Sequence, residues 1–393
     1  MAFTPAAVPK SILGYHRVLS PTAGVRVSPL CLGAMNFGDA WKQAMGECNK
    51  ETTFEILDYF FEQGGNFIDT ANAYQGGESE QWIGEWMATR ENREQIILAT
   101  KYATLYTSGK GAMNSNFSGN HSKSLKNSID ASLKKLGTDY IDLFFVHWWD
   151  FTTSIPELMQ SLNHLVAAGK ILYLGISDTP AWVVVKANCY AREHGLTPFS
   201  VYQGKWNAAT RDFERDILPM CESEGMGIAP WGVLGSGDFK TPEQREQDVG
   251  EGRKMFPPEE RNALVAGKLD EIARRKGTVL TSVVYSLSFS FSALAYIMHK
   301  YPYVYPIVGG RKLSHLKSNI EALSIELSDE EVDEIEGVAE FDIGWPMNML
   351  FSAGQGGSKY SSRMTSKDVA WTGFAAKLDA PEKVRAIRPR KLE

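Results

Sequence analysis

Strand-like and helix-like patterns alternate along almost the whole chain, and this alternation limits the folds available to it. The strand patterns occupy residues 29–33, 67–69, 96–100, 140–146, 171–176, 199–202, 226–230 and 303–308. Helical patterns follow them at 54–61, 79–88, 124–136, 154–169, 182–194, 212–225, 262–275 and 313–323. The strands are almost continuously apolar, as parallel strands covered on both faces are. Eight such units in a row predict an α/β chain folded as a (β/α)8 TIM barrel with long rim loops.

The domain organisation follows from the length of 393 residues. We expect one domain over 1–393, with the barrel at about 28–325 and a C-terminal cover tail at about 328–393. The tail begins with one acidic helix start and continues as an irregular stretch rich in Gly, Ser and aromatic residues. Residues 284–292 alternate apolar side chains with serine inside a helical context. This pattern predicts an insertion that is looped out or forms an irregular helix.

The composition argues against several classes of partner. A net charge of -6 gives no signature of polyanion binding, so we expect no nucleic-acid partner. No stretch approaches the roughly 20 uncharged apolar residues that a membrane span needs, and the N-terminus lacks a secretory signal. The four cysteines are far apart and form no CxxC pair, which favours a reducing compartment and indicates no zinc site. We therefore expect a cytoplasmic globular protein.

Four polar residues stand at or just beyond the ends of predicted strands. Asp69, Lys101 and His147 end or directly follow the strand patterns, and Tyr74 lies five residues after Asp69. In a (β/α)8 barrel the carboxyl ends of the strands form the rim where catalytic groups converge. An acid, a phenol, an ammonium and an imidazole on that rim suit the polarisation and protonation of a carbonyl oxygen. These four residues are the predicted catalytic set.

The electrostatics of this set follow from proximity. A cation beside the phenol favours the phenolate, so we expect Lys101 to lower the pKa of Tyr74 toward working pH. Asp69 would pair with Lys101 and hold it, and His147 would orient the carbonyl. No side chain supplies a hydride, so a carbonyl reduction needs a cofactor.

Two glycine-rich runs mark the candidate cofactor site. They are the segment 231–237 after the seventh strand and 309–312 after the eighth, where barrels usually hold phosphate. Gly235, Ser236 and Gly237 would let backbone N–H groups approach a pyrophosphate. Arg311 and Lys312 would bind the 2′-phosphate of NADP at the start of the last helix. The dinucleotide fingerprint GxGxxG is absent after the first strand, which argues against a Rossmann fold.

The motifs carry a family resemblance over most of the chain. The segments FIDTANAY (67–74), ATK (99–101), VH (146–147), GISD (175–178), Gln203 and GGR (309–311) resemble the aldo-keto reductase superfamily. The longer segments YLGISDTPAW (173–182) and PIVGGRK (306–312) are similar to its fungal aryl-alcohol dehydrogenase and norsolorinic acid reductase-like branch.

The resemblance implies an NADP-dependent carbonyl reductase that works without a metal, with Tyr74 as general acid. Its implied cofactor contacts are Met35, Asn36, Asp69, Ser177, Asp178, Gln203, Trp231, Gly232, Leu234, Gly235, Ser236, Gly237, Gly309, Arg311, His315, Ser318 and Asn319. Among them, Ser177, Asp178 and Gln203 would bind the nicotinamide carboxamide, and Trp231 would stack on the ring. Many members of the superfamily carry Asn where Asp178 stands, and Tyr is commoner at the position of Trp231.

The substrate side is predicted from aromatic residues on rim loops. Trp41, Tyr102, Trp148 and Trp149, with Trp345 and Phe351 of the tail, would form an aromatic box for a flat aryl aldehyde, ketone or alcohol. The oligomeric state stays open. An alternative is an NADPH-binding regulatory subunit without significant turnover. A metal-dependent barrel hydrolase is a further alternative, although the histidines show no metal-ligand spacing.

Overall fold

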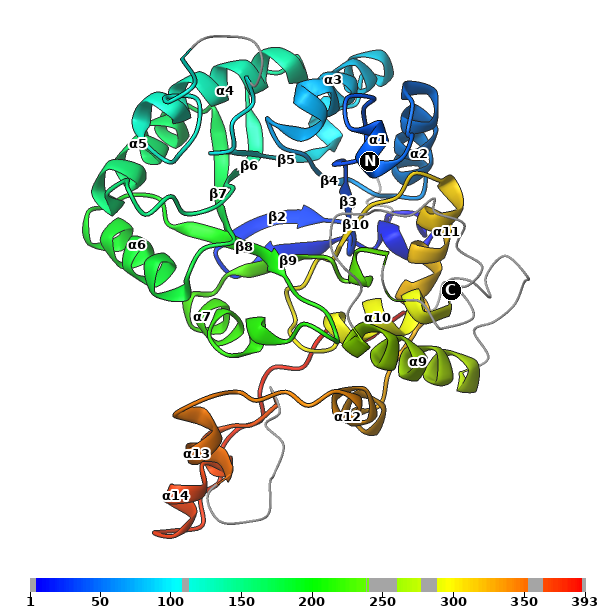
Figure 1. The fold of residues 1–393 in the computed structure, drawn as a ribbon, viewed down its shortest axis with the longest axis vertical. Helices are drawn as coiled ribbons and strands as arrows, with labels where there is room; N and C mark the ends of the chain where they lie inside the picture. Colours follow the sequence, from blue (N-terminus) through cyan, green and yellow to red (C-terminus); the bar gives the residue numbers. More distant parts are fainter. Residues whose placement is uncertain are drawn as a thin grey trace.

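The computed structural model describes residues 5–107, 113–237, 239, 260–276, 288–352 and 363–390. Eight parallel strands form one sheet in the order β10-β3-β4-β5-β6-β7-β8-β9. The strands are β3 (Cys31–Gly33), β4 (Phe67–Asp69), β5 (Ile97–Tyr102), β6 (Ile141–Val146), β7 (Ile171–Ser177), β8 (Phe199–Lys205), β9 (Gly227–Trp231) and β10 (Ile307–Val308). Consecutive strands are neighbours, and helices surround them (Figure 1). This architecture confirms the predicted (β/α)8 barrel.

The sheet closes between its first and last strands through the segment before β10. Ile228 of β9 forms a parallel bridge with Val304. The Ile228 amide donates to the Tyr303 carbonyl at 2.8 Å, and the Tyr305 amide donates to the Ile228 carbonyl at 2.8 Å. The predicted strand at 303–308 therefore contributes two regular residues and one bridge, which makes the barrel nearly closed.

The helices stand outside the barrel, at the predicted places except for α1 and α10, which are additional. They are α1 (Lys42–Met45), α2 (Lys50–Glu62), α3 (Glu78–Arg90), α4 (Ser122–Leu136), α5 (Ile155–Ala167), α6 (Ala181–Glu193), α7 (Ile217–Glu224), α9 (Glu260–Arg275), α10 (Ser288–Met298) and α11 (Leu313–Glu321). Helix α4 shows why they form. Leu125, Ile129 and Leu136 bury one face, and Gly137 ends the helix in the left-handed conformation at φ 62°. No helix within the described ranges is long and apolar enough to cross a membrane.

Two hydrophobic cores follow from the alternation of side chains along each strand. Residues that point outward, such as Ile68, Leu98 and Phe144, pack under the helices. Residues of the opposite parity, such as Phe67 and Ala99, fill the barrel interior. The alternation therefore decides which rim residues face the barrel axis.

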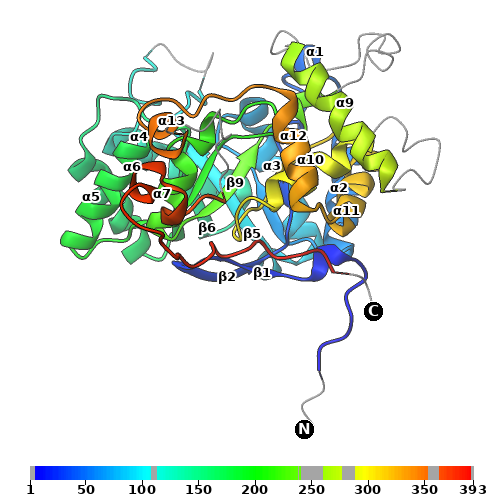
Figure 2. The same cartoon turned by 90° about the horizontal axis from the view of Figure 1, so that it is seen from below.

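A β-hairpin closes the amino-terminal end of the barrel. Strands β1 (Arg17–Ser20) and β2 (Ala23–Val27) pair antiparallel and lie across the bottom of the strands (Figure 2). Leu19, Ala23 and Val27 join the interior core. From the sequence only a lead-in is expected here, because the strands are short and interrupted by Arg17, Ser20 and Arg26. Because the hairpin closes the amino-terminal end, the mouth of the barrel is at the carboxyl end of the strands.

The serine-rich segment at 284–292 is helical where it can be described. Helix α10 begins at Ser288, so the expected strand-like alternation at 288–292 lies on a helix. Residues 284–287 lie outside the described residues. The prediction of an irregular or looped segment is therefore untested for its first half.

The described part of the C-terminal tail lies against the outer wall of the barrel. It contains α12 (Asp329–Val338), α13 (Met347–Ser352) and α14 (Ala370–Gly373). Phe341 sits beside the Arg211 and Arg215 guanidiniums at 4.6 and 4.8 Å, and Arg390 stacks over Tyr15 near the N-terminal hairpin. In Figure 1 the helices α12–α14 lie beyond the ring of barrel helices. The described tail residues therefore lie beside the barrel, and a tail that covers the mouth stays a prediction.

Candidate active site

The barrel interior continues directly into the predicted catalytic residues. On three strands, a core residue that faces the axis is followed two positions later by a polar residue of the site. These pairs are Phe67 and Asp69, Ala99 and Lys101, and Phe145 and His147. Because side chains alternate with a period of two, each polar residue faces the same axis one layer higher. Strand register therefore gathers Asp69, Lys101 and His147 at the mouth.

Lys101 is the centre of the site. Its side chain is fully buried, and its ammonium donates to Asp69 Oδ1 at 2.5 Å, to the Thr70 carbonyl at 2.8 Å and to the Tyr74 hydroxyl oxygen at 3.2 Å. The three donors of the ammonium thus have three acceptors, which a buried cation requires. Gln203 Nε2 donates to the second oxygen of Asp69 at 3.0 Å and holds the carboxylate in place.

The site keeps its lysine charged and its tyrosine protonated. Burial disfavours the ammonium of Lys101, but Asp69 and Tyr74 outweigh it, so the pKa of Lys101 is raised. Burial also raises the pKa of Tyr74, and Lys101 only partly opposes this. The sequence analysis predicted a lowered pKa because it counted the cation without the burial. The correction matters, because Tyr74 holds its proton at neutral pH as a general acid must.

His147 lies beside Tyr74 and is electrically neutral. The two rings meet edge to face, with centroids 5.8 Å apart and planes inclined by 77°. Burial, with a smaller contribution from the Lys101 charge, lowers the pKa of His147 to about 3. The imidazole is therefore uncharged over the whole physiological range. It acts as a hydrogen-bonding group rather than as a second acid.

The loop that carries Tyr74 is braced by its neighbour in sequence. Gln75 adopts a left-handed backbone at φ 53°, which is uncommon for a residue with a side chain. Its buried amide accepts from the Trp41 backbone N–H at 2.7 Å and donates to the Met35 carbonyl at 3.0 Å. The Trp41 ring stands edge to face with Tyr74, at 6.4 Å between centroids. Gln75 therefore fixes both Tyr74 and the aromatic ring beside it, and sequence analysis did not identify this role.

The expected nicotinamide contacts lie on the same rim. The Ser177 hydroxyl is buried and has no hydrogen-bond partner among the described residues. Trp231 Nε1 donates to Asp178 Oδ1 at 3.3 Å, and Asp178 adopts a left-handed backbone at φ 40°. Burial raises the pKa of Asp178 to about 6, although the bond from Trp231 opposes the shift. An unsatisfied hydroxyl beside an amide and a carboxyl fits the donors and acceptors of a carboxamide.

The glycine-rich run after β9 forms a tight turn with several left-handed residues. Gly235, Ser236 and Gly237 have φ values of 65°, 54° and 91°, and Gly232 has a φ of 70°. The Gly235 and Gly237 amides donate to the Gly232 and Leu234 carbonyls within the turn, at 2.9 and 3.3 Å. Leu234 lies within the same turn and is packed against the outer core. Phosphate binding at this run stays a prediction.

The last candidate contacts gather around the start of α11. Arg311 lies against Gly46, so closely that a Cβ at Gly46 would overlap its guanidinium. Gly309 packs on the carbonyl of Gly33, at 3.2 Å from an added Cβ. Two further residues, Ser318 and Asn319, are buried on α11, and Asn36 is buried after β3. Burial lowers the pKa of His315, with help from the charges of Lys312 and Arg311.

Two of the expected substrate contacts, Tyr102 and Trp149, are buried in the core under the helices. Tyr102 is 0% exposed, stacks on Phe144 and donates to the Asn120 carbonyl at 3.1 Å. Trp149 is 8% exposed and belongs to the core under the helices. Tyr102 directly follows Lys101 on β5, so alternation turns it away from the axis, whereas Trp149 lies in the loop beyond the end of β6. Trp41 and Trp148, both 36% exposed, remain at the rim.

Of the two tail aromatics expected in the box, Trp345 lies away from the rim residues. Trp345 is 74% exposed on the segment before α13, which lies outside the ring of barrel helices (Figure 1).

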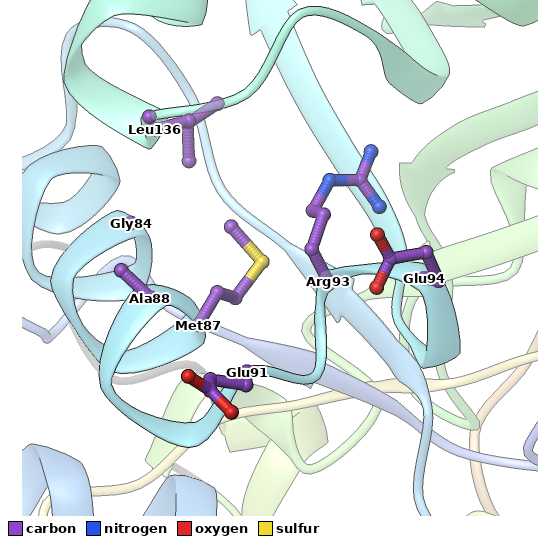
Figure 3. A pocket seen from close by; sticks show the side chains of 8 residues that line it. Gly84, Met87, Ala88, Glu91, Arg93, Glu94 and Leu136 are labelled. Atoms are coloured by element: carbon purple, nitrogen blue, oxygen red, sulfur yellow. The ribbon is translucent and has the colours of Figure 1, made fainter.

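A surface hollow lies far from the mouth. Figure 3 shows this hollow of about 240 Å³, which is lined by Gly84, Met87, Ala88, Glu91, Arg93, Glu94, Leu136 and Gly137. Arg93 and Glu94 precede β5, so the hollow opens toward the amino-terminal end of the strands. It contains none of the predicted site residues.

The fold and the rim site together define a barrel enzyme of carbonyl–alcohol chemistry, and the comparisons with known proteins agree. Residues 29–340 match the model of the Aldo/keto reductase family. The chain is 57% identical over 390 residues to norsolorinic acid reductase A of Aspergillus parasiticus, covering 99% of this chain and 97% of that protein. It is 56% identical to an aryl-alcohol dehydrogenase of Pestalotiopsis microspora, covering 89% and 88%. A putative aryl-alcohol dehydrogenase of Saccharomyces cerevisiae is 51% identical, with 88% and 93% covered.

The chain belongs to the aldo/keto reductase family and is an oxidoreductase. The family uses a nicotinamide cofactor, NADH or NADPH. The resemblance to the fungal aryl-alcohol dehydrogenase and norsolorinic acid reductase branch is confirmed. The alternatives of a regulatory subunit without turnover and of a metal-dependent hydrolase are not favoured by these relatives.

Proposed function

We propose that this protein is an NADPH-dependent reductase of aromatic aldehydes or ketones, reversible toward the alcohol. The observation that carries the proposal is the Asp69–Lys101–Tyr74 cluster, in which one buried ammonium contacts both a carboxylate and a phenol. The four cysteines are free, and the site needs no disulfide. Both features suit a protein that works in the reducing cytoplasm.

Tyr74 acts as the general acid toward the carbonyl oxygen. Its raised pKa keeps the proton on the phenol until the oxygen of the substrate becomes basic. Lys101 then stabilises the phenolate that remains, because its ammonium lies 3.2 Å from the phenol oxygen. Asp69 and Gln203 keep the lysine in position. In the reverse direction the phenolate accepts the proton of the alcohol.

The neutral His147 donates a hydrogen bond to the same carbonyl oxygen and orients it. A charged imidazole would compete with Lys101 for Asp69 and repel the ammonium, and the depressed pKa prevents this. NADPH, when bound, supplies the hydride to the carbonyl carbon.

The cofactor would lie across the rim from β7 to α11. Ser177, Asp178 and Gln203 would hold the carboxamide, and Trp231 would stack on the ring. The turn at Gly235–Gly237 would hold the pyrophosphate. Arg311 would bind the 2′-phosphate, which is the reason to propose NADPH over NADH.

The substrate would be a flat aromatic carbonyl compound held between Trp41 and Trp148. Both rings are partly exposed, and Trp41 stands edge to face with Tyr74. The relatives named as aryl-alcohol dehydrogenases support an aromatic substrate.

The test is NADPH consumption by the purified full chain with two aldehydes of matched size, benzaldehyde and cyclohexanecarbaldehyde. We expect both to be reduced, with kcat/KM about 3- to 10-fold higher for the aromatic compound. NADH serves as the second cofactor in the same assay. Absence of NADPH consumption with every aromatic carbonyl tried would reject the proposal, and a preference for the aliphatic ring would reject its substrate class.

A further inference from the structure

His147 is connected to a chain of hydrogen bonds that the family motifs did not reveal. The indole Nε1 of Trp148 lies 3.0 Å from Thr104 Oγ1, and this oxygen lies 3.2 Å from His147 Nδ1. The chain therefore runs from an aromatic ring at the rim, through one hydroxyl, to the imidazole beside Tyr74.

The donor and acceptor of each hydrogen bond between Trp148, Thr104 and His147 can be assigned from the chemistry of the groups. An indole N–H only donates, so Thr104 Oγ1 accepts from Trp148 and keeps its own hydrogen available. Among the described residues this hydroxyl has no other possible acceptor than His147, so its hydrogen goes to Nδ1. A ring nitrogen that accepts cannot carry the proton of a neutral imidazole. The proton of His147 is then on Nε2, the other nitrogen of the ring.

The backbone around Thr104 is built to hold this arrangement. Ala103, directly before it, has a φ of 107°, a conformation that a residue with a Cβ adopts only when its surroundings impose it. The Ala103 carbonyl accepts from the Gly119 N–H at 2.8 Å. The next residue, Asn120, donates from Nδ2 to the Trp148 carbonyl at 2.9 Å. One segment, residues 119–120, thus anchors both the loop of Thr104 and the loop of Trp148.

The neutral state of His147 makes the tautomer decisive. With a pKa of about 3, the ring carries a single proton over the physiological range. Only the nitrogen that bears this proton is able to donate to a substrate oxygen.

We propose that Thr104 is a positioning residue that holds His147 as the Nε2–H tautomer, with Trp148 anchoring the Thr104 hydroxyl. The inference rests on the proposed function, since it assigns the Nε2–H as the donor to the carbonyl oxygen of the substrate. Thr104 itself touches neither substrate nor cofactor and acts through His147. It also connects a predicted substrate-contacting ring to the group that orients the carbonyl.

The first test reads the tautomer directly, without turnover. Nitrogen NMR spectra of the full chain labelled at histidine distinguish Nε2–H from Nδ1–H rings, and His147→Gln assigns the signal. We expect a neutral Nε2–H ring whose Nδ1 shows the shift of a hydrogen-bond acceptor. A His147 protonated on Nδ1 in the wild type would overturn the inference, whatever the variants do.

The second test compares three threonine variants in the reductase assay. Thr104→Val removes the hydroxyl at nearly constant shape, and we expect kcat to fall about 10- to 100-fold because the donor is no longer oriented. Thr104→Ser keeps the hydroxyl and should stay within about 3-fold of the wild type. Thr107→Val makes the same change in the same loop, where the hydroxyl bonds Asn114 instead. It should leave kcat unchanged.

The NMR measurement and the variant kinetics together distinguish a failure of this inference from a failure of the proposed function. The KM and Kd for NADPH should stay constant in Thr104→Val, since only the carbonyl side is affected. A Thr104→Val enzyme with wild-type kcat, or a Thr104→Ser enzyme as slow as Thr104→Val, would overturn the positioning role. A wild type that reduces no carbonyl would instead reject the proposed function, because the NMR arm reads His147 independently of the reaction.

Discussion

The ammonium of Lys101 lies 2.5 Å from Asp69 Oδ1 and 3.2 Å from the hydroxyl oxygen of Tyr74, inside a site that seals the lysine from solvent. The carboxylate keeps the lysine charged, and the lysine limits the rise in the pKa of the phenol. Burial still has the larger effect on the pKa of Tyr74, so the phenol is a weak acid that releases its proton only to a strongly basic oxygen. Burial and the Lys101 charge therefore act in opposite directions on the pKa of Tyr74.

Replacing Lys101 with Met should slow the enzyme without removing its cofactor site. We expect kcat for aldehyde reduction to fall about 10²- to 10³-fold, because the phenolate loses its counter-charge. The pKa of Tyr74 should rise further, so the pH profile of alcohol oxidation should move to higher pH. Lys317→Ala on α11 is the control, since its ammonium lies over Tyr59 at 5.2 Å and outside the site. A Lys101→Met enzyme with wild-type kcat would argue against this role of the cation.

Asp178 should make the protein less stable as pH rises. Its pKa is about 6 in the folded state against 3.8 as the ordinary value, so the folded state binds the proton more tightly. Stability is then highest below about pH 4, falls as the group ionises up to about pH 6, and stays level above. Because Asp178 is exposed to solvent, which screens the effect, Asp178→Asn should gain less than about 1 kcal/mol at pH 7 and little at pH 4. Denaturant unfolding at both pH values measures this, and an equal difference at the two pH values would contradict it.

Arg311 should set the preference between the two nicotinamide cofactors. We expect Arg311→Ala to raise the Kd for NADPH about 10- to 100-fold. This corresponds to the free energy of one charge-assisted hydrogen bond to a phosphate. NADH, which lacks the 2′-phosphate, should change by less than about 3-fold. Fluorescence titration with both cofactors makes the comparison. An equal loss for NADPH and NADH would show that the 2′-phosphate binds elsewhere.

The neighbouring residues Trp148 and Trp149 should respond to mutation in different ways. Trp148 is partly exposed at the rim, so Trp148→Ala should raise KM for an aromatic aldehyde about 3- to 10-fold. Trp149 is buried in the outer core, so Trp149→Phe should lower the free energy of unfolding by about 1–3 kcal/mol and leave KM unchanged. Steady-state kinetics and denaturant unfolding of both variants test the pair. The reverse pattern would show that the substrate contacts Trp149.

Much of this arrangement could be predicted from the sequence, because parallel strands buried on both faces leave a simple signal. Apolar runs that end in Asp69, Lys101 or His147 place those residues on one rim once the barrel is recognised. The family motifs then supplied the cofactor residues, which composition alone does not indicate. Strand boundaries agreed within a few residues, except at β10, where only Ile307 and Val308 are regular.

The errors have physical causes. Tyr102 follows the inward-facing Lys101 by one position on β5, so its aromatic character suggested a rim contact that alternation forbids. Trp149 lies in the loop after β6, where no strand pattern indicates that the ring is buried. The net direction of the Tyr74 pKa depends on burial, which is a property of the folded site and not of the motif. Thr104 was missed because it stands three residues beyond Lys101 in an irregular loop, where no periodic pattern indicates which way a hydroxyl points.

The rate of aromatic aldehyde reduction by Tyr74→Phe, at saturating NADPH, tests the central claim most directly. The variant loses one oxygen and keeps the ring packing on Trp41 and His147. We predict that kcat falls about 10²- to 10⁴-fold while the Kd for NADPH is unchanged, because the variant lacks the phenol that protonates the substrate oxygen in the proposed mechanism. A Tyr74→Phe enzyme that reduces the aldehyde at the wild-type rate would contradict the account.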